Sequence, residues 1–247
     1  SEMCIRDRLS AMHREIDMVT TPAGDPVAMV HCNNCTSDLN AWVGLFAEFA
    51  ECFNIKADKN TLFSTLYQKA MEGDKDCGGM IACNYYSGEP VTGLEEGRPM
   101  FLRRPDSHLG LANFMRSHLY ASLATLKIGL DILLKEEDVK IDSITGHGGL
   151  FKTKGVGQSI LAAAMNAPIS VMETAGEGGA WGMALLAAYM LSKKDGQSLG
   201  DYLDSRVFAE RKSETMEPDL ADVAGFETYT KQYQACLAAE KAAVQAF

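Results

Sequence analysis

A glycine-rich stretch, GHGGLFKTKGVGQ at residues 146–158, has residue types that suit a loop holding a nucleotide or another anion. It follows an apolar segment and precedes a helix pattern. The pair Gly148-Gly149 permits positive φ angles and close approach of a ligand to the backbone. Backbone N–H groups at the start of the following helix favour a negative charge. The stretch is therefore a candidate nucleotide-binding loop.

Two familiar phosphate-loop patterns do not fit this stretch. The P-loop pattern, G-x-x-x-x-G-K-[ST], requires a second glycine five positions after the first. Counted from Gly148 that position is Thr153, and counted from Gly149 it is Lys154. The dinucleotide pattern G-x-G-x-x-G fails at Phe151. A tight turn between a strand and a helix, with no ligand, therefore stays open as an alternative.

The hydrophobic pattern on either side of the loop predicts alternating strands and helices. Strands are expected over 26–32, 78–86, 139–145 and 168–174, and helices over 36–53, 62–73, 119–133, 155–166, 178–191 and 219–237. The charged residues 135–140 between them are expected to form a solvated turn. The order strand, helix, strand, helix implies an α/β unit with right-handed crossovers.

Bulk composition excludes several classes of protein. The 247 residues carry a net charge of -10, which argues against nucleic acid as a partner but not against a nucleotide. No run of about eighteen apolar residues predicts a membrane span. The seven cysteines are irregularly spaced, and no secretory signal is present. We therefore expect a cytoplasmic protein with reduced thiols.

Three motifs appear in a fixed order along residues 29–191. The first is NYYSGE at 84–89, the second is RSHLYASLATL at 116–126, and the third is the glycine loop followed by a helix with EGGAWGMALLA at 177–187. Together they resemble the C-terminal domain of the FGGY family of carbohydrate kinases, in the actin-like ATPase superfamily. The sequence departs from the family pattern at Thr125, Leu150 and Trp181.

The resemblance implies a fold and a set of ligands. It implies an α/β, actin-like ATPase (ribonuclease H-like) domain over 9–215, with a mixed sheet flanked by helices, and a helical C-terminal extension over 216–247. ATP with Mg²⁺ is the implied cofactor. The implied nucleotide-binding residues are Gly148, Gly149, Leu150 and Thr153, and the residues implied to lie near the sugar are Ser87, Gly88 and Glu89. A pentulose is the implied substrate, with xylulose favoured by Y-x-S-G-E and ribulose next.

The same resemblance implies that part of the kinase is missing. Residues 1–8 resemble a translated sequencing adapter, so we expect the chain to be the back end of a longer protein. The catalytic aspartate and a G-T-S phosphate loop would lie upstream, and no catalytic or metal-binding residue is assigned here. The chain alone is expected to be inactive, with the sugar bound through the missing half and a homodimer possible. The alternative is an actin-like nucleotide-binding module with a structural or regulatory role.

Several polar residues outside these motifs have ordinary explanations. Asp38 and Asp142 lack the flanking glycines of the family's catalytic segment, and we expect surface or capping carboxylates. The segment HCNNC at 31–35 lacks a second ligand pair for zinc, so buried thiols at a strand end are expected. Lys152 and Lys154 are close enough to the loop to hold phosphate, but solvated lysines are the favoured interpretation.

Overall fold

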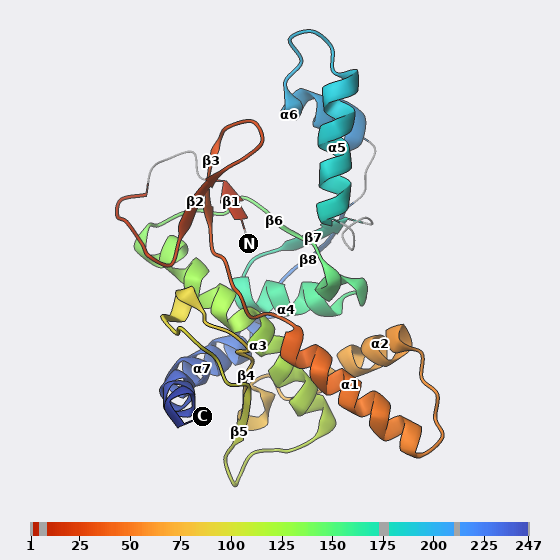
Figure 1. Ribbon diagram of the computed structural model, residues 1–247, viewed down its shortest axis with the longest axis vertical. Helices are drawn as coiled ribbons and strands as arrows, with labels where there is room; N and C mark the ends of the chain where they lie inside the picture. The colour runs from red at the N-terminus through yellow and green to blue at the C-terminus, as the bar shows by residue number, and fades with distance from the viewer. Residues whose placement is uncertain (1, 5–8, 173–177, 210–212, 247) are drawn as a thin grey trace.

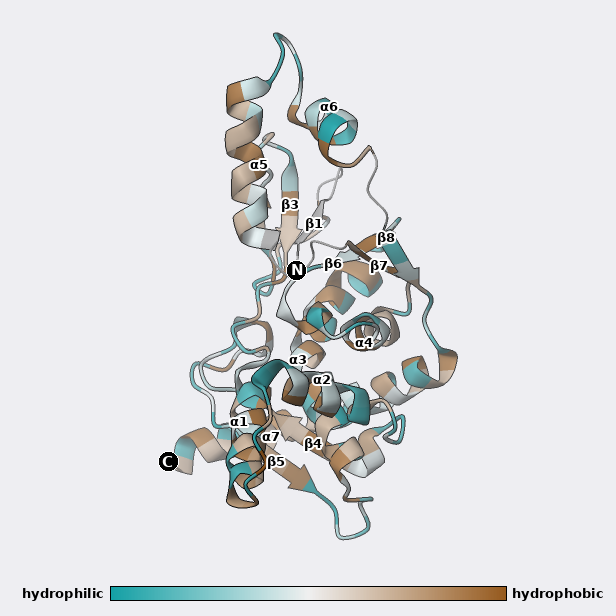
Figure 2. Ribbon diagram, turned by 90° about the vertical axis from the view of Figure 1, so that its right-hand side faces the viewer, coloured by the Kyte–Doolittle hydropathy of each residue, from teal (hydrophilic) through white to brown (hydrophobic). Residues whose placement is uncertain are grey.

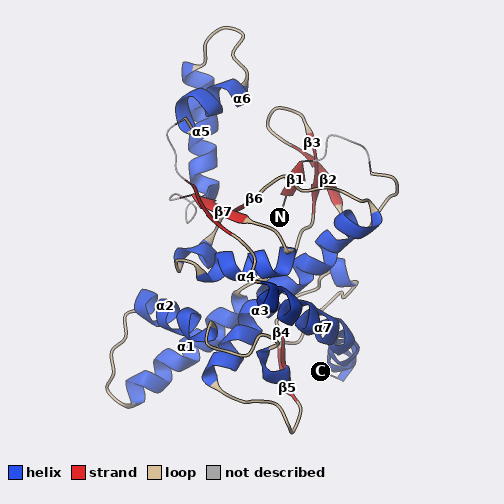
Figure 3. Ribbon diagram, turned by 180° about the vertical axis from the view of Figure 1, so that it is seen from behind, coloured by secondary structure: helices blue, strands red, loops and turns tan. Residues whose placement is uncertain are grey.

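The computed structural model describes residues 2–4, 9–172, 178–209 and 213–246 (Figure 1). The described residues form helices and three small sheets, as Figure 3 shows. The strands are β1 (Glu2–Cys4), β2 (Asp17–Thr20), β3 (Pro26–Met29), β4 (Met80–Cys83), β5 (Met100–Arg103), β6 (Ile144–Gly146), β7 (Ile169–Met172) and β8 (Ser213–Met216). The α-helices are α1 (Ser37–Cys52), α2 (Lys59–Ala70), α3 (Leu111–Asp131), α4 (Val156–Met165), α5 (Gly178–Ser192), α6 (Leu199–Tyr202) and α7 (Leu220–Ala246).

The sheet that carries the glycine loop is mixed. Strands β6 and β7 pair in parallel, joined by α4, and β8 pairs antiparallel with β7. The other two sheets, β1-β3-β2 and β4-β5, are antiparallel. Residues 2–4, which the sequence analysis sets aside, pair with β3. The predicted α/β class, with a mixed sheet, flanking helices and a helical tail, is confirmed.

The strand expected over 139–145 is much shorter than predicted. It begins only at Ile144, because the N–H group of Val139 bonds to the carbonyl of Leu133 at 2.9 Å. Asp138 has a φ of 49°, in the left-handed region, which turns the chain away from the end of the helix. Val139 and Ile141 thus pack against the core in the segment that leaves the helix, and they are not part of the strand.

Helix α3 is the centre of the core. It contacts α2, α4, α7 and β4, and buried residues occur on every side of it. The leucine spacing predicts one buried face, whereas Ala121, Ala124 and Ser117 are also buried. A helix that is covered on all sides belongs to the interior of a domain. Figure 2 shows the hydrophobic strands β4 and β5 beside these helices.

The C-terminal helix α7 contributes its aromatic side chains to the same core. Phe226, Tyr229 and Tyr233 are fully buried. The hydroxyl of Tyr229 donates to the carbonyl of Ser117 at 2.8 Å, which ties α7 to α3. A side chain at Gly225 would lie 2.0 Å from the carbonyl oxygen of Lys75, so the two backbones meet closely there. The helical tail is therefore packed as an interior element.

A buried arginine joins three helices. Arg116 of α3 is fully buried and forms an ion pair with Asp222 of α7. Its guanidinium also donates to the hydroxyl of Tyr120 at 2.9 Å and to the carbonyl of Ala70, at the end of α2, at 3.4 Å. Lys75 lies 2.7 Å from the same Asp222 carboxylate. Arg116 thus satisfies groups that the surrounding helices would otherwise bury without partners.

We expect Arg116→Met to lower the free energy of unfolding by about 3–5 kcal/mol, because it leaves a buried carboxylate and helix-end carbonyls without their main donor. Urea unfolding measures this change. Arg104→Met is the matched control, since Arg104 pairs with Asp106 on the exposed surface at 3.3 Å, and it should cost less than about 1 kcal/mol. Equal effects of the two variants would contradict the role given to Arg116.

Glu137 does not lie in a solvated turn, contrary to the expectation for residues 135–140. Its side chain is 4% exposed and accepts hydrogen bonds from the N–H groups of Ser10 at 2.6 Å and Ala11 at 3.2 Å. The imidazole Nε2 of His13 lies 2.5 Å from the same carboxylate. These bonds, led by that of His13, lower the pKa of Glu137 to about 2. The carboxylate therefore holds residues 10–13 against the end of α3.

The lowered pKa of Glu137 predicts an acid-dependent contribution to stability. Its folded value lies below the ordinary value of 4.5, so the contribution is complete above about pH 4.5 and is lost as the pH falls towards 2. Melting temperatures of the wild type and Glu137→Gln should therefore differ at pH 6 and converge between pH 4.5 and 2. A difference that stays constant over this range would be the contrary result.

Candidate functional site

The glycine loop connects β6 to α4 through a single turn of 3₁₀ helix at Gly149–Lys152. Four of its five glycines are required by the fold itself. A side chain at Gly146 would meet the Phe151 ring at 2.5 Å, one at Gly157 would meet the carbonyl of Leu150 at 2.5 Å, and Gly148 and Gly155 have φ angles of 107° and 80°.

Gly149 differs from the other four glycines of the loop. It has no positive φ, and no atom lies within 4 Å of where its side chain would begin. Neither backbone conformation nor packing therefore explains a glycine at this position. Open space over an unobstructed backbone is what the close approach of a ligand requires.

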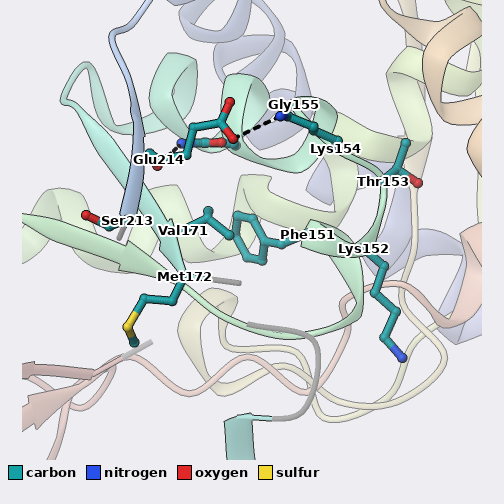
Figure 4. A pocket seen from close by; sticks show the side chains of 10 residues that line it. Phe151, Lys152, Thr153, Lys154, Gly155, Val171, Met172, Ser213 and Glu214 are labelled. Atoms are coloured by element: carbon teal, nitrogen blue, oxygen red, sulfur yellow. Dashed lines mark hydrogen bonds and ion pairs between the residues drawn. The ribbon is translucent and has the colours of Figure 1, made fainter. Parts of the chain in front are cut away.

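Three cavities border the loop. One of about 840 Å³ lies between His147-Gly148 and residues of α5 and beyond, among them Trp181, Leu185 and Phe208. A second, of about 730 Å³, is lined by Gly148, Gly149 and Leu150, by α3 and α4, and by Thr36 just before α1. A third, of about 390 Å³, is lined by Thr153, Gln158 and Met172 (Figure 4).

The four residues implied to bind the nucleotide are thus divided among these cavities. Gly148 borders both larger cavities, Gly149 and Leu150 border the 730 Å³ cavity, and Thr153 borders the smallest one. Leu150 is also buried in the hydrophobic core. Gly148 and Gly149 are therefore the two positions with backbone open to a ligand, whereas Leu150 supports the loop from the inside.

A glutamine in the lining of the 390 Å³ cavity connects α4 to two strands. The carboxamide nitrogen of Gln158, in the first turn of α4, donates to the carbonyls of Ile169 at 2.7 Å and Glu214 at 2.8 Å. Figure 4 shows the Phe151 ring within this lining and the ion pair between Lys154 and Glu214, 3.1 Å apart. Lys152 and Lys154 are both exposed, as the sequence analysis favours.

The two parts of the third motif, the glycine loop and helix α5, meet at the largest of these three cavities. Trp181 and Gly182 of α5 line it opposite Gly148, and the Trp181 ring lies 6.0 Å from that of Phe208. Glu177, which begins the motif, lies outside the described residues. Figure 2 shows hydrophobic residues along α5, and Met183, Met190 and Leu191 are exposed on this helix. Two motifs that are about thirty residues apart thus face one apolar space.

The NYYSGE motif is anchored through Glu89. This carboxylate is fully buried and accepts from the N–H groups of Asn33 at 3.0 Å and Asn34 at 3.1 Å. The side-chain oxygen of Asn34 in turn accepts from the N–H groups of Tyr86 at 2.8 Å and Ser87 at 3.1 Å. Burial raises the pKa of Glu89 despite these bonds. Glu89 therefore shapes the loop, and Ser87 is left exposed at its surface.

Asp38 is not a surface or capping carboxylate, contrary to the expectation. It is 5% exposed and makes no capping hydrogen bond in α1. One of its oxygens lies 3.2 Å from Nδ1 of buried His118, in α3. Asp38 also borders a small cavity of about 280 Å³ together with Trp42 and Phe101. Nothing near Asp38 in the sequence indicates a partner eighty residues away. Asp142 is exposed, as expected.

The thiols of residues 31–35 are less buried than predicted. Cys35 is exposed and Cys32 is half-buried, so the expectation of buried thiols is wrong for Cys35. Burial raises the pKa of Cys32 to about 12.

Within the described ranges, no three His, Cys, Asp or Glu side chains gather as metal ligands. In the same part of the chain, no helix is both long and apolar enough to cross a membrane.

Comparison with known proteins now identifies the family. Residues 1–191 match the sequence model of the FGGY family of carbohydrate kinases, C-terminal domain. The chain belongs to the FGGY family. A search of the curated proteins found no match.

Solved structures of several kinases share this fold. A ligand-bound xylulose kinase from Lactobacillus acidophilus superposes with a TM-score of 0.66 at 16% identity, over 91% of this chain and 42% of that one. A gluconate kinase from the same organism gives 0.66 at 18% identity, with the same coverage. Glycerol kinase with ADP from Plasmodium falciparum gives 0.53 at 17% identity, over 78% of this chain and 36% of that one. The chain thus spans less than half the length of these kinases.

We expect Glu89→Ala to lower the free energy of unfolding by about 2–3 kcal/mol, because three N–H donors lose their acceptor inside the protein. Glu95→Ala, in the exposed part of the same loop, should stay within about 0.5 kcal/mol of the wild type. Chemical denaturation measures both. If Glu89→Ala is as stable as Glu95→Ala, the carboxylate does not hold the loop.

Proposed function

We propose that this chain is the ATP-binding half of a carbohydrate kinase that transfers the γ-phosphate of ATP to a hydroxyl group of a pentulose. Family membership supports the reaction class. The observation that carries the nucleotide site is Gly149, a loop glycine that neither backbone strain nor packing explains. Such a position fits a site where a ligand lies directly against the backbone.

The adenosine end of ATP fits the 840 Å³ cavity, whose lining is largely apolar on the side of α5. Gly148 belongs to this cavity and to the neighbouring one of 730 Å³, which Gly149 and Thr36, just before α1, also border. The phosphates are proposed to lie there, because the start of a helix favours an anion. Leu150 and Thr153 are buried and are proposed to support the loop from its protein side. When bound, ATP supplies the phosphoryl group, and Mg²⁺ neutralises its charge.

The Mg²⁺ ion would be held mainly by the phosphates and by waters, as is usual for this cation. The described residues of this chain contain no cluster of carboxylates to bind it directly. The base that accepts the proton of the sugar hydroxyl is likewise proposed to come from the remainder of the kinase.

The sugar is proposed to lie beyond the exposed loop formed by Ser87 and Gly88. Asn34 and Glu89 fix the backbone of this loop, so its surface is preorganised for a ligand. Xylulose is the favoured pentulose and ribulose the next, because NYYSGE resembles the loop of xylulose kinases. The solved structures with this fold include xylulose kinases from Lactobacillus acidophilus and Rhodospirillum rubrum.

Thermal unfolding of the chain with MgATP tests the nucleotide site. A concentration 100-fold above Kd should stabilise the protein by about 2.7 kcal/mol, a rise in Tm of roughly 5–10 °C. Gly149→Val should keep the Tm of the free protein and abolish the rise, because the new side chain fills only the space proposed for ATP. Gly44→Val, at an exposed glycine of α1 with equally open surroundings, is the control and should retain it.

Loss of the ATP response in Gly44→Val as well, or its survival in Gly149→Val, would place the nucleotide elsewhere. The sugar assignment needs the chain joined to its missing half. ADP release that depends on xylulose supports the proposed substrate. Nucleotide-dependent assembly without ADP release for any pentulose, hexulose or polyol would instead support the structural or regulatory module.

A further inference from the structure

Two cysteines that are far apart in the sequence face each other inside the fold. Cys83 ends β4, and Cys236 lies in the middle of α7, with their Sγ atoms 3.2 Å apart. Cys83 is 1% exposed, whereas Cys236 is half-buried. A disulfide requires about 2.05 Å between the sulfurs, so a shift of about 1 Å would suffice to join them.

The two thiols are chemically unequal. The hydrogen bond between the sulfurs lowers the pKa of Cys236 and raises the pKa of Cys83, which burial raises further. The thiolate is the form that attacks a disulfide or a peroxide. The more accessible sulfur is thus also the better nucleophile, and the enclosed sulfur lies ready to react with it in a second step. This is the arrangement of an attacking and a resolving thiol.

The pair lies among contacts that reach the NYYSGE loop. Asn84, next to Cys83, donates to the carbonyl of Cys35 at 2.8 Å and accepts from the hydroxyl of Tyr233 at 3.1 Å. Tyr233 is one turn of α7 before Cys236. One turn after it, Glu240 accepts from the N–H group of Arg98 at 2.5 Å. A bond between the sulfurs would therefore restrain α7 against both ends of the 84–98 segment.

The geometry points to Cys83 and Cys236 as a redox-reactive dithiol that low-molecular-weight disulfides convert to an intramolecular disulfide, tightening the attachment of the NYYSGE loop. In the first step, the Cys236 thiolate attacks oxidised glutathione, forms a mixed disulfide and releases one glutathione thiolate. In the second, the released glutathione thiolate takes the proton of Cys83, and the Cys83 thiolate attacks Cys236 Sγ and expels a second glutathione thiolate. Two protein thiols are oxidised and one glutathione disulfide is reduced.

Peptide mapping by mass spectrometry, after incubation with oxidised glutathione and alkylation of the remaining thiols, tests this pairing. The expected product is a peptide linked through Cys83 and Cys236, lighter by two hydrogens than the two reduced peptides. Its formation should raise Tm by about 5–10 °C, because the link closes a long loop. Hydrogen exchange of the backbone amides of Tyr86 and Ser87 should slow severalfold.

Cys236→Ser and Cys236→Ala should lose both the linked peptide and the rise in Tm, whereas Cys35→Ser, at an exposed cysteine, should keep both. The wild-type map is decisive even if a Cys236 variant fails to fold. Stable glutathione on Cys236 with Cys83 still free, or a dominant link between other cysteines, overturns the pairing. A linked peptide with unchanged amide exchange at Tyr86 and Ser87 overturns its effect on the loop.

Discussion

Enclosure of α3 is the constraint on which the rest of the structure depends. A helix covered on all sides must meet each neighbour through side chains that fit closely, and it must also satisfy every polar group that it buries. Small residues such as Ala121 and Ala124 allow α7 and β4 to approach. Arg116 and Ser117 meet the polar requirement by bonding to groups of α2 and α7. Helices α1, α2, α4 and α7 and strand β4 all pack against this helix.

Both candidate ligand loops are attached to that core by side-chain amides that bond to backbone groups. Asn34 fixes the NYYSGE loop through the N–H groups of Tyr86 and Ser87, and Gln158 fixes the end of the glycine loop through two strand carbonyls. An amide has donors and an acceptor in one plane, so it can substitute for a missing strand partner. The loops are thereby held in shape without being buried, which leaves their surfaces available.

Local sequence patterns predicted a good part of this fold. The helices at 37–52, 156–165 and 178–192 and the strand at 169–172 follow from periodicity and turn residues. The site was predicted as a loop, from the pair Gly148-Gly149, but its separation into three cavities was not. That separation depends on Phe151, which packs over Gly146, and on the distant residues of α5 and β8.

Contacts between distant residues explain most of what the sequence could not indicate. The pairs Asp38–His118, His13–Glu137 and Cys83–Cys236 each join segments eighty or more residues apart. Asp38 and Glu137, read within their own segments, have the pattern of a surface or turn residue, and no segment indicates the partner of any of these residues. Periodicity reports which face of an element is covered, but not which residue covers it.

The position of Tyr229 also has a consequence for how the chain is made. Its hydroxyl accepts a hydrogen bond from the N–H group of Ala82, a residue that leaves the ribosome 147 positions earlier. At translation rates of about 5–20 residues per second, β4 waits about 7–30 seconds for this partner. During that interval the groove later filled by Phe226, Tyr229 and Tyr233 is open to water and to other nascent chains. The interior of this protein is thus completed only after α7 has been synthesised.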